Sequence, residues 1–471
     1  MSLWTASDAA RATGGRATAD WQATSLSIDT RSLRAGDLFV ALTAARDGHE
    51  FVAQAFEKGA SAALVTHRPE GVPEDAPLLI VPDVMDALRA LGAAGRARAR
   101  AKVIGVTGSA GKTSTKEMLR EMLSDFGQVH AAEASFNNHW GVPVTLARLD
   151  PNADFAVIEI GMNSPGEIEP LARLARPDVA LITTIAPAHL EAFDGIEGIA
   201  HEKASIFNGL TPEAHAIYPG DLATTPILAK AAADSGAHVL PFGKDAPELR
   251  LHEITIGAEA LVLRAQVGRM RVAVRLHNAG AHFAMNALGC LGVAHALGLD
   301  LARAALALGR WQPPAGRGLR QQIVIDPVEE LHFTLIDDAF NANPASLAAA
   351  LEMLAVMTPG VSLSGRSGRR IAILGDMLEL GPQEQQMHAA AADLPAMAAV
   401  DLVHCVGPRM AALHGALPQR KRGRHVAQAE ELAHIAHRLV APGDIVLVKG
   451  SKASLVSRVV DGLRSLDTGA G

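Results

Sequence analysis

The chain has 471 residues, of which 49% are hydrophobic and 4% aromatic, and its formal net charge is −7. This length is too great for one hydrophobic core and predicts three domains of ordinary size. The net negative charge argues against a nucleic-acid-binding protein, which would carry a basic surface. The two cysteines, Cys290 and Cys405, do not have the spacing of a metal site. Because the sequence has no signal-peptide-like start and no long apolar run, we expect a cytoplasmic protein without membrane insertion or a nucleic-acid partner.

Residues 1–100 predict a separate recognition domain, because they contain short strands, polar turns and one helix over 51–60 that ends at a glycine. The domain ends in a basic run, Arg96, Arg98, Arg100 and Lys102, which we expect to be a solvated helix end.

The segment VIGVTGSAGKTSTKEML, residues 103–119, predicts a buried strand, a glycine turn and a helix that begins near Lys112. The first glycine of the common loop G-x-x-x-x-G-K-[ST] would fall on Val106, so the match is the shorter T-G-x-x-G-K-T. Its backbone N–H groups would hold a polyphosphate, Lys112 would reach the outer phosphates, and the Thr113 hydroxyl would ligate Mg²⁺. The predicted nucleotide contacts are Gly108, Ser109, Ala110, Gly111, Lys112, Thr113 and Ser114.

Strand-like apolar runs alternate with helical ones from residue 102 onward, which is typical of α/β domains with parallel sheets. The runs are 102–106, 154–161, 178–183, 333–337, 371–375, 402–407 and 445–450. The segment RWQPPAGRGLRQQ breaks this pattern, so we predict a central ATP-binding domain over 101–316 and a C-terminal domain over 317–471.

Three further residues accompany the phosphate loop. Glu159 stands alone in an apolar strand near its carboxyl end, where a buried carboxylate must be paired or bound to metal. His189 follows the next strand, and Lys203 lies on a helix. Taken singly, these would be an ordinary loop histidine and a solvated lysine, but together with the phosphate loop they indicate a catalytic site.

Seven segments in order resemble the motifs of the Mur ligases: TGSAGKTSTKEM, SFNNHWGVPVTLARL, IEIGMNSPGEI, APAHLEAF with EKASIF, GRG, DDAFNANPASL and GDMLELG. The last two are most similar to the branch that adds D-alanyl-D-alanine to a UDP-N-acetylmuramoyl tripeptide. The segment SIDTRSLRAGDLFVAL, followed by DGHEF, is similar to the part of the family that binds the UDP-sugar. The resemblance implies a UDP-substrate-binding α/β domain, a central P-loop ATPase-type parallel sheet and a C-terminal Rossmann-like α/β domain.

The resemblance also implies a reaction. ATP phosphorylates the tripeptide carboxylate, and the amine of D-alanyl-D-alanine attacks the acyl phosphate to give an amide and phosphate. Two Mg²⁺ ions are implied, one at Thr113 and Glu159 and one at His189 and a carbamylated Lys203. Lys112, Glu159, His189 and Lys203 are the implied catalytic residues.

Other site residues follow from matching motif positions. Asn286, Arg317 and Asp338 would contact the nucleotide. Thr30, Arg31, Asp47, Gly48, His49, Asn137 and Asn138 would contact the UDP-linked substrate. An Asn-rich turn at Asn137 and a β-turn with Gly48 at positive φ are the structural alternatives. Asn341 and Asn343 would order their loop, and Asp376, Glu379 and Lys449 would face the dipeptide or the tripeptide.

The sequence departs from the family pattern at two positions. Phe283 replaces the first asparagine of H-N-x-x-N, which puts one adenine contact in doubt. Ser205 stands where a glutamate is common, so a partner of Lys203 is missing or replaced.

Two other interpretations remain open. A sister ligase would add a single amino acid, usually with a D-N-P-R motif where this chain reads NANPAS, or would extend folates. A non-catalytic nucleotide-binding scaffold would lack the metal ligands, which are all present in this sequence. We expect a monomer, and the third residue of the tripeptide stays open between diaminopimelate and lysine.

Overall fold

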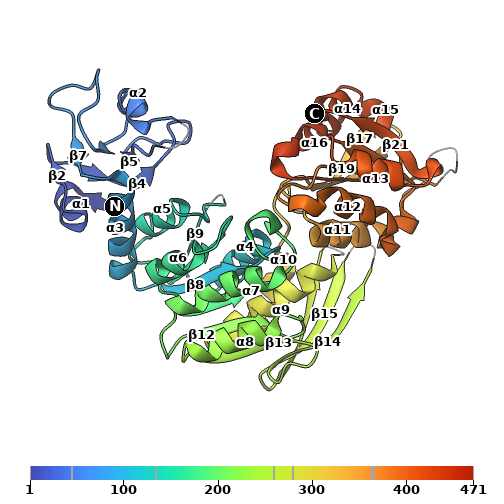
Figure 1. The fold of residues 1–471 in the computed structure, drawn as a ribbon, viewed down its shortest axis with the longest axis horizontal. Coiled ribbons are helices and arrows are strands. Elements are labelled where there is room, and N and C mark those ends of the chain that lie inside the picture. Colours follow the sequence, from blue (N-terminus) through green and yellow to red (C-terminus); the bar gives the residue numbers. More distant parts are fainter. Residues whose placement is uncertain are drawn as a thin grey trace.

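The computed structural model describes residues 2–43, 46–132, 135–257, 260–277, 280–361, 365 and 367–469. The chain forms three α/β bodies in sequence order, coloured from blue through green to red in Figure 1. The N-terminal and C-terminal bodies lie at opposite ends of that view, and the central body lies between them. The predicted three-domain α/β fold is confirmed, whereas the boundaries at residues 100 and 316 stay predictions.

The N-terminal body is built on a sheet whose described strands follow the order β2-β7-β6-β5-β4. Strands β4 to β7 pair in parallel, and β2 pairs antiparallel with β7. The strands are β2 (Arg16–Ala17), β4 (Ser25–Ser27), β5 (Asp37–Val40), β6 (Ala62–Val65) and β7 (Leu78–Ile80), with a separate pair of β1 (Trp4–Thr5) and β3 (Gln22–Ala23). The helices are α1 (Ala6–Thr13), α2 (Val52–Glu57) and α3 (Val84–Arg98).

The N-terminal body packs on the central body through α3 and α5 (Gly141–Ala147). Ala147 belongs to the N-terminal core, and the Trp4 indole donates a hydrogen bond of 2.9 Å to its carbonyl. Within the basic run, Arg100 and Lys102 are exposed as predicted, whereas Arg96 and Arg98, in the last turn of α3, are covered by other parts of the structure. Arg96 donates to a backbone carbonyl of the central body at 2.8 Å, and the Arg98 guanidinium lies 3.9 Å from the centre of the Trp4 ring. The Arg96 contact joins the two bodies, whereas the Arg98 contact lies within the N-terminal body.

The central body contains a sheet whose nine described strands follow the order β16-β15-β14-β13-β12-β11-β8-β10-β9. The pairs from β9 to β14 are parallel, as predicted, whereas β14, β15 and β16 form an antiparallel meander. Apolar runs could not predict the meander, because its strands alternate buried and exposed side chains. The strands are β8 (Lys102–Thr107), β9 (Val129–Ala131), β10 (Phe155–Glu159), β11 (Val179–Ile182), β12 (His215–Pro219), β13 (His238–Gly243), β14 (Leu249–Ile256), β15 (Leu261–Val267) and β16 (Met270–Leu276).

Helices cover both faces of the central sheet. One core contains side chains of α4 (Lys112–Ser124), α9 (Ala281–Ala296) and α10 (Leu301–Arg310). The other contains side chains of α5, α6 (Ile168–Ala175), α7 (Ile196–Ala204) and α8 (Thr225–Asp234). Because helices bury both faces of the sheet, a ligand can reach it only at the edge formed by the carboxyl ends of its parallel strands. The phosphate loop follows β8 there, between the neighbouring strands β10 and β11.

The C-terminal body contains a sheet whose described strands follow the order β17-β18-β22-β19-β20-β21, parallel except for β17. The strands are β17 (Leu319–Asp326), β18 (Leu331–Asp338), β19 (Arg370–Gly375), β20 (Leu402–Val406), β21 (Arg422–Val426) and β22 (Ile445–Lys449). The helices are α11 (Pro344–Val356), α12 (Glu384–Ala390), α13 (Ala411–Ala416), α14 (Ala429–Ala433), α15 (Ala436–Leu439) and α16 (Ser457–Arg464). Helices again pack on both faces. Within the described part of the chain, no helix has the length and apolar character to cross a membrane.

Candidate active site

The phosphate loop lies between β8 and α4, as the sequence predicts. Gly108 and Gly111 have φ angles of 149° and 81°, which side chains with a Cβ rarely adopt. Gly111 is the N-cap of α4, so the first N–H groups of the helix point toward the loop. The Lys112 ammonium donates 2.7 Å to the Gly108 carbonyl and so closes the loop on itself. This geometry is suited to an anion at the helix N-terminus.

Glu159 lies beside the first turn of α4. The carboxylate is 2% exposed and accepts a hydrogen bond of 3.0 Å from the Thr113 hydroxyl and one of 2.8 Å from the Asn137 side-chain amide. Arg317 donates to the same Thr113 hydroxyl at 3.1 Å. The site thus combines a hydroxyl and a carboxylate, both oxygen donors of the kind that Mg²⁺ prefers. The Lys112 ammonium lies near Glu159. Desolvation lowers the pKa of Lys112, and the Glu159 charge partly opposes this shift.

His189 and Lys203 lie on the other side of β8, after β11 and on α7. His189 has a φ of 58°, and its Nδ1 lies 2.5 Å from the Glu379 carboxylate of the C-terminal body. Burial lowers the pKa of His189, and Glu379 opposes this shift. Lys203 is 1% exposed, and burial together with the Lys112 charge lowers its pKa well below the ordinary value. Among the described residues, no cluster of three or more His, Cys, Asp or Glu side chains has a metal-binding arrangement.

The departure at Ser205 has a structural explanation. The Ser205 hydroxyl donates 2.6 Å to the Glu202 carbonyl of its own helix, so it does not take the place of a carboxylate beside Lys203. The Glu202 carboxylate in turn accepts the backbone N–H groups of Gly166 and Ile168 at 2.7 and 2.8 Å. Glu202 therefore ties α7 to the start of α6.

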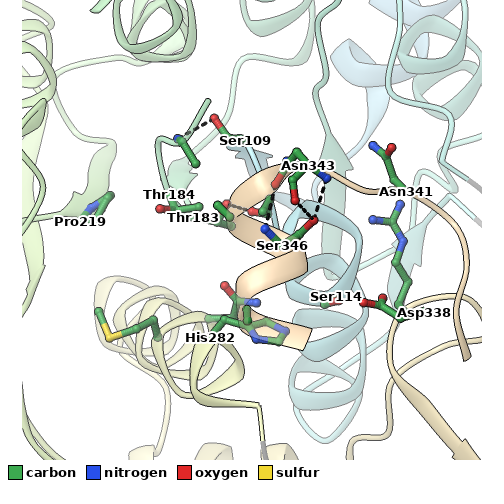
Figure 2. A pocket seen from close by; sticks show the side chains of 18 of the residues that line it. Ser109, Ser114, Thr183, Thr184, Pro219, His282, Asp338, Asn341, Asn343 and Ser346 are labelled. Carbon is green, nitrogen blue, oxygen red and sulfur yellow. Dashed lines mark hydrogen bonds between the residues drawn. The ribbon is translucent and has the colours of Figure 1, made fainter. Parts of the chain in front are cut away.

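A cavity of about 310 Å³ joins the phosphate loop to the C-terminal body. In Figure 2, Thr183 and Asp338 lie on opposite sides of Asn343 and Ser346, which belong to the start of α11. The cavity is lined by Ser109, Ala110, Gly111, Ser114, Thr183, Thr184, Ala186, Pro219, Asp221, Leu222, His282, Met285, Asn286, Arg317, Asp338, Asn341, Asn343, Ala345, Ser346, Ala349 and Lys449. Its position fits a nucleotide whose phosphates lie at the loop.

Asn286 belongs to the cavity wall, next to the phosphate loop. A Cβ on Gly111 would lie 2.9 Å from its amide, so the glycine gives this side chain room next to the loop. Its Nδ2 is buried and has no hydrogen-bond partner among the residues that the structure describes. A buried donor without a partner costs free energy, which a ligand acceptor in the cavity would recover.

Phe283 and His282 point to different surroundings. Phe283 is 2% exposed and packs edge-to-face on Trp311 with 5.1 Å between ring centres, so this departure from the family pattern lies in the core. His282, which the sequence analysis did not single out, lines the cavity instead. The residue is exposed overall, while desolvation of its ring at the cavity and the Lys449 charge lower its pKa. Its only signal in the sequence was its place directly before Phe283.

The C-terminal residues are placed by the pairing of β18 with β22, which puts Asp338 opposite Lys449. The Lys449 ammonium donates 2.7 Å to the Asp338 carboxylate and 2.9 Å to the Asn341 carbonyl. Burial raises the pKa of Asp338, and Lys449 opposes this shift. Lys449 thus lines the nucleotide cavity together with Asp338, whereas the sequence suggested a contact to dipeptide or tripeptide. Asn343 caps α11, in line with the predicted ordering role.

Two other residues have structural partners. Asp376 is 4% exposed and accepts the Met410 backbone N–H at 2.9 Å, which holds a loop within the C-terminal body. The Asn138 side-chain oxygen accepts the Gly141 N–H at 2.9 Å, at the start of α5. Asn137 contacts Glu159 instead, so the two neighbouring asparagines have different roles.

The N-terminal residues cluster in the first body. Thr30 donates 2.8 Å to the Gln54 side chain, and Arg31, with 88% of its side chain exposed, forms a 2.6 Å ion pair with its neighbour Asp29. Asp47 accepts the His49 N–H at 3.0 Å and caps a 3₁₀ turn, Gly48–Phe51.

Gly48 does not have the positive φ of the β-turn alternative, which is therefore wrong. A Cβ at Gly48 would lie 2.6 Å from the Ala41 carbonyl carbon, so the close approach of two backbones requires the glycine.

Comparisons with known proteins agree with this geometry. The model of the Mur ligase middle domain matches residues 106–294, and that of the Mur ligase glutamate ligase domain matches residues 320–452. The chain is 34% identical over 458 residues to a UDP-N-acetylmuramoyl-tripeptide--D-alanyl-D-alanine ligase of Escherichia coli (strain K12), covering 96% of each protein.

Solved structures give the same result. A crystal structure of MurF from Acinetobacter baumannii superposes with a TM-score of 0.84 at 29% identity and covers 98% of this chain and 99% of that one. The MurF ligase of Thermotoga maritima in complex with ADP has a TM-score of 0.77 at 25% identity, with 94% and 97% covered. From the sequence matches, the shared three-body architecture and the phosphate-loop site, the chain belongs to the Mur ligase family, in its MurF branch.

Proposed function

We propose that this chain is an ATP-dependent amide ligase that joins D-alanyl-D-alanine to a UDP-N-acetylmuramoyl tripeptide. The observation that carries the proposal is the cavity in which the phosphate loop meets Arg317, Asp338 and Lys449 from beyond the central sheet. A nucleotide held there contacts two bodies at once, which a nucleotide-binding scaffold does not require. The relatives named as dipeptide-adding ligases favour this acceptor over a single amino acid or a folate.

The reaction balances in two steps. A carboxylate oxygen of the tripeptide attacks the γ-phosphorus of ATP, the bond from that phosphorus to the bridging oxygen breaks, and ADP leaves. The amine of D-alanyl-D-alanine then attacks the acyl carbon, the carbon–oxygen bond to phosphate breaks, and a proton passes to solvent. The first step brings two anions together, so positioning and charge neutralisation are the main tasks of the protein. Lys112 and Arg317 are half-buried cations next to Thr113 and Glu159 and suit that task.

The donor set fits Mg²⁺, because Thr113 and Glu159 offer a hydroxyl and a carboxylate in direct contact. These two residues would hold one ion, and His189 and Lys203 would hold a second. Bound Mg²⁺ would neutralise phosphate charge and orient the phosphoryl group. An ammonium cannot ligate a cation, but a carbamate can. The strongly lowered pKa of Lys203 favours the neutral amine that reacts with CO₂, which supports carbamylation at this position.

The UDP-linked substrate would bind the N-terminal body at Thr30, Arg31 and the turn from Asp47 to His49, and its peptide would reach Asn137. Arg31 supports this assignment because its guanidinium is exposed and oriented by Asp29. Asn138 accepts the N–H of Gly141, the first residue of α5, and would act indirectly. We propose that the protein acts as a monomer in the cytoplasm, where ATP is available, and that its domains are residues 1–100, 101–316 and 317–471.

Phosphate release from MgATP tests the proposal. The purified protein is given UDP-N-acetylmuramoyl tripeptide and D-alanyl-D-alanine separately and together, and the product is analysed by mass spectrometry. Release with formation of the UDP-linked pentapeptide only when both are present is expected. Lys112→Met should abolish release, whereas Lys102→Met, at an exposed lysine that starts the same strand–loop–helix unit, should leave it unchanged. Release with single amino acids or folates would identify a sister ligase, and no release would favour a scaffold.

A further inference from the structure

Glu379 connects two bodies at the proposed metal site. It belongs to the segment GDMLELG, which follows β19, yet its carboxylate oxygen lies 2.5 Å from Nδ1 of His189 in the central body. The backbones approach each other as well, because a Cβ on Gly381 would lie 3.6 Å from the Cα of Glu191. The pair is therefore part of a contact between two loops.

The backbone at both residues is unusual. His189 and Glu379 have φ angles of 58° and 62°, and neither is a glycine. Such conformations are strained and persist only where the surroundings determine them. On the C-terminal side, the Leu378 N–H donates 3.0 Å to the Ser451 hydroxyl, and the Met377 N–H donates 3.0 Å to the buried ring of His388. The loop that carries Glu379 is thus fixed to its own body before it meets His189.

We propose that Glu379 is a positioning residue that holds the proton of His189 on Nδ1 and leaves Nε2 as the ligand atom. The proposal rests on the proposed function in one respect, the role of His189 at a metal ion. Ligating histidines commonly donate their second ring N–H to a carboxylate, which fixes the tautomer and the ring orientation. The angles at the present contact lie outside hydrogen-bond geometry. The Glu379 side chain is 55% exposed, so its rotation into line would not require a buried side chain to repack.

The contact between Glu379 and His189 links two bodies of the protein. His189 belongs to the central body, whereas Glu379 belongs to the C-terminal body, so His189 is oriented only while the two loops are in contact. His189 would therefore take up its metal-binding orientation at the same time as the nucleotide cavity forms, because both bodies also contribute to that cavity. A simple docking ion pair would hold the bodies together without selecting a tautomer.

The first experiment is ¹⁵N NMR of the histidine-labelled protein without metal, nucleotide or substrate, with the His189 signals assigned from a His189→Gln variant. The wild type and Glu379→Gln should show the Nδ1–H tautomer, because the amide oxygen still accepts. Glu379→Ala should lose that preference. Glu191→Gln, which removes an exposed charge two residues from His189, is the matched control and should behave as wild type.

The second experiment measures the Mn²⁺ affinity of the ADP-loaded proteins by electron paramagnetic resonance. Glu379→Ala should bind Mn²⁺ about 10- to 100-fold more weakly, the usual effect of removing such a partner. Glu379→Gln should stay within about threefold of wild type, since it keeps the acceptor. An unchanged tautomer in Glu379→Ala would refute the proposal and leave a docking contact. The NMR experiment needs no metal or substrate. A failed ligase assay would therefore overturn the proposed function but would not change the tautomer that the NMR spectrum reports.

Discussion

The phosphate loop allows a sharp test at Gly108. An alanine at this position would have to adopt a φ near 149°, and its Cβ would overlap the Thr183 hydroxyl and lie 3.1 Å from the Thr184 backbone nitrogen. The Thr183 hydroxyl also donates 2.5 Å to the Ala110 carbonyl of the same loop. Gly108→Ala therefore strains the backbone and displaces a side chain that holds the loop.

The magnitude follows from these two effects. The backbone conformation costs an alanine about 1–3 kcal/mol. Loss of the hydrogen bond from Thr183 adds about 1 kcal/mol. Together they amount to about 2–4 kcal/mol against the binding conformation of the loop, or about 30- to 1,000-fold weaker nucleotide binding. The melting temperature should change little, because the loop can relax when no nucleotide is bound.

Isothermal titration with ADP and Mg²⁺ measures the effect, and Gly105→Ala is the control. Gly105 lies three residues earlier on β8, and its Cβ would meet Ile206 and Pro177 at an ordinary 3.4 Å. This variant should bind ADP within about threefold of wild type, consistent with surroundings that accept a methyl group. Wild-type affinity in Gly108→Ala would refute the reasoning, because the loop would then tolerate a side chain at its closest approach.

Three further predictions concern single residues. Asn286→Ala should weaken ADP binding about tenfold without lowering the melting temperature, because its buried amide has no partner in the described structure; a lower melting temperature and unchanged binding would contradict this. Lys203→Ala should lower kcat at least about 100-fold, as expected for loss of a metal ligand, and formate or acetate should restore part of it; the carbamate role is wrong if neither these acids nor bicarbonate restores activity. Burial lowers the pKa of His404 to about 4. The stability that its neutral ring contributes is present above pH 6.5 and is lost as the pH falls toward 4. Urea unfolding should thus show about 2 kcal/mol more loss between pH 7.5 and pH 5 in wild type than in His404→Asn, and equal losses would exclude this histidine as the cause.

Several parts of the site could be predicted from the sequence because their chemistry is local. The phosphate loop depends on two glycines, a lysine and a threonine within a few residues, and the order strand, turn and helix follows from the same segment. Glu159 could be assigned because a lone carboxylate in a buried strand needs a partner. The structure provides that partner in Thr113.

Other expectations failed where the deciding contact lies far away in the sequence. The sequence predicts that Arg96 and Arg98 are solvated at a helix end. In the structure, Arg96 contacts the central body and Arg98 packs on Trp4. The role of Gly48 was tied to a turn, but the structure requires it for the approach of the Ala41 backbone. A local pattern gives charge and turn tendency, whereas burial depends on which other segment packs there.

The phosphate loop, the parallel strands and the family could all be predicted from the sequence, because each depends on short segments whose residue types have few physical alternatives. Which distant groups share the site depends on the tertiary structure. Lys449 faces Asp338 because β22 pairs with β18, and Glu379 meets His189 because two bodies approach each other. Such contacts join residues more than 100 positions apart, and their distances depend on the packing of whole sheets rather than on any local pattern.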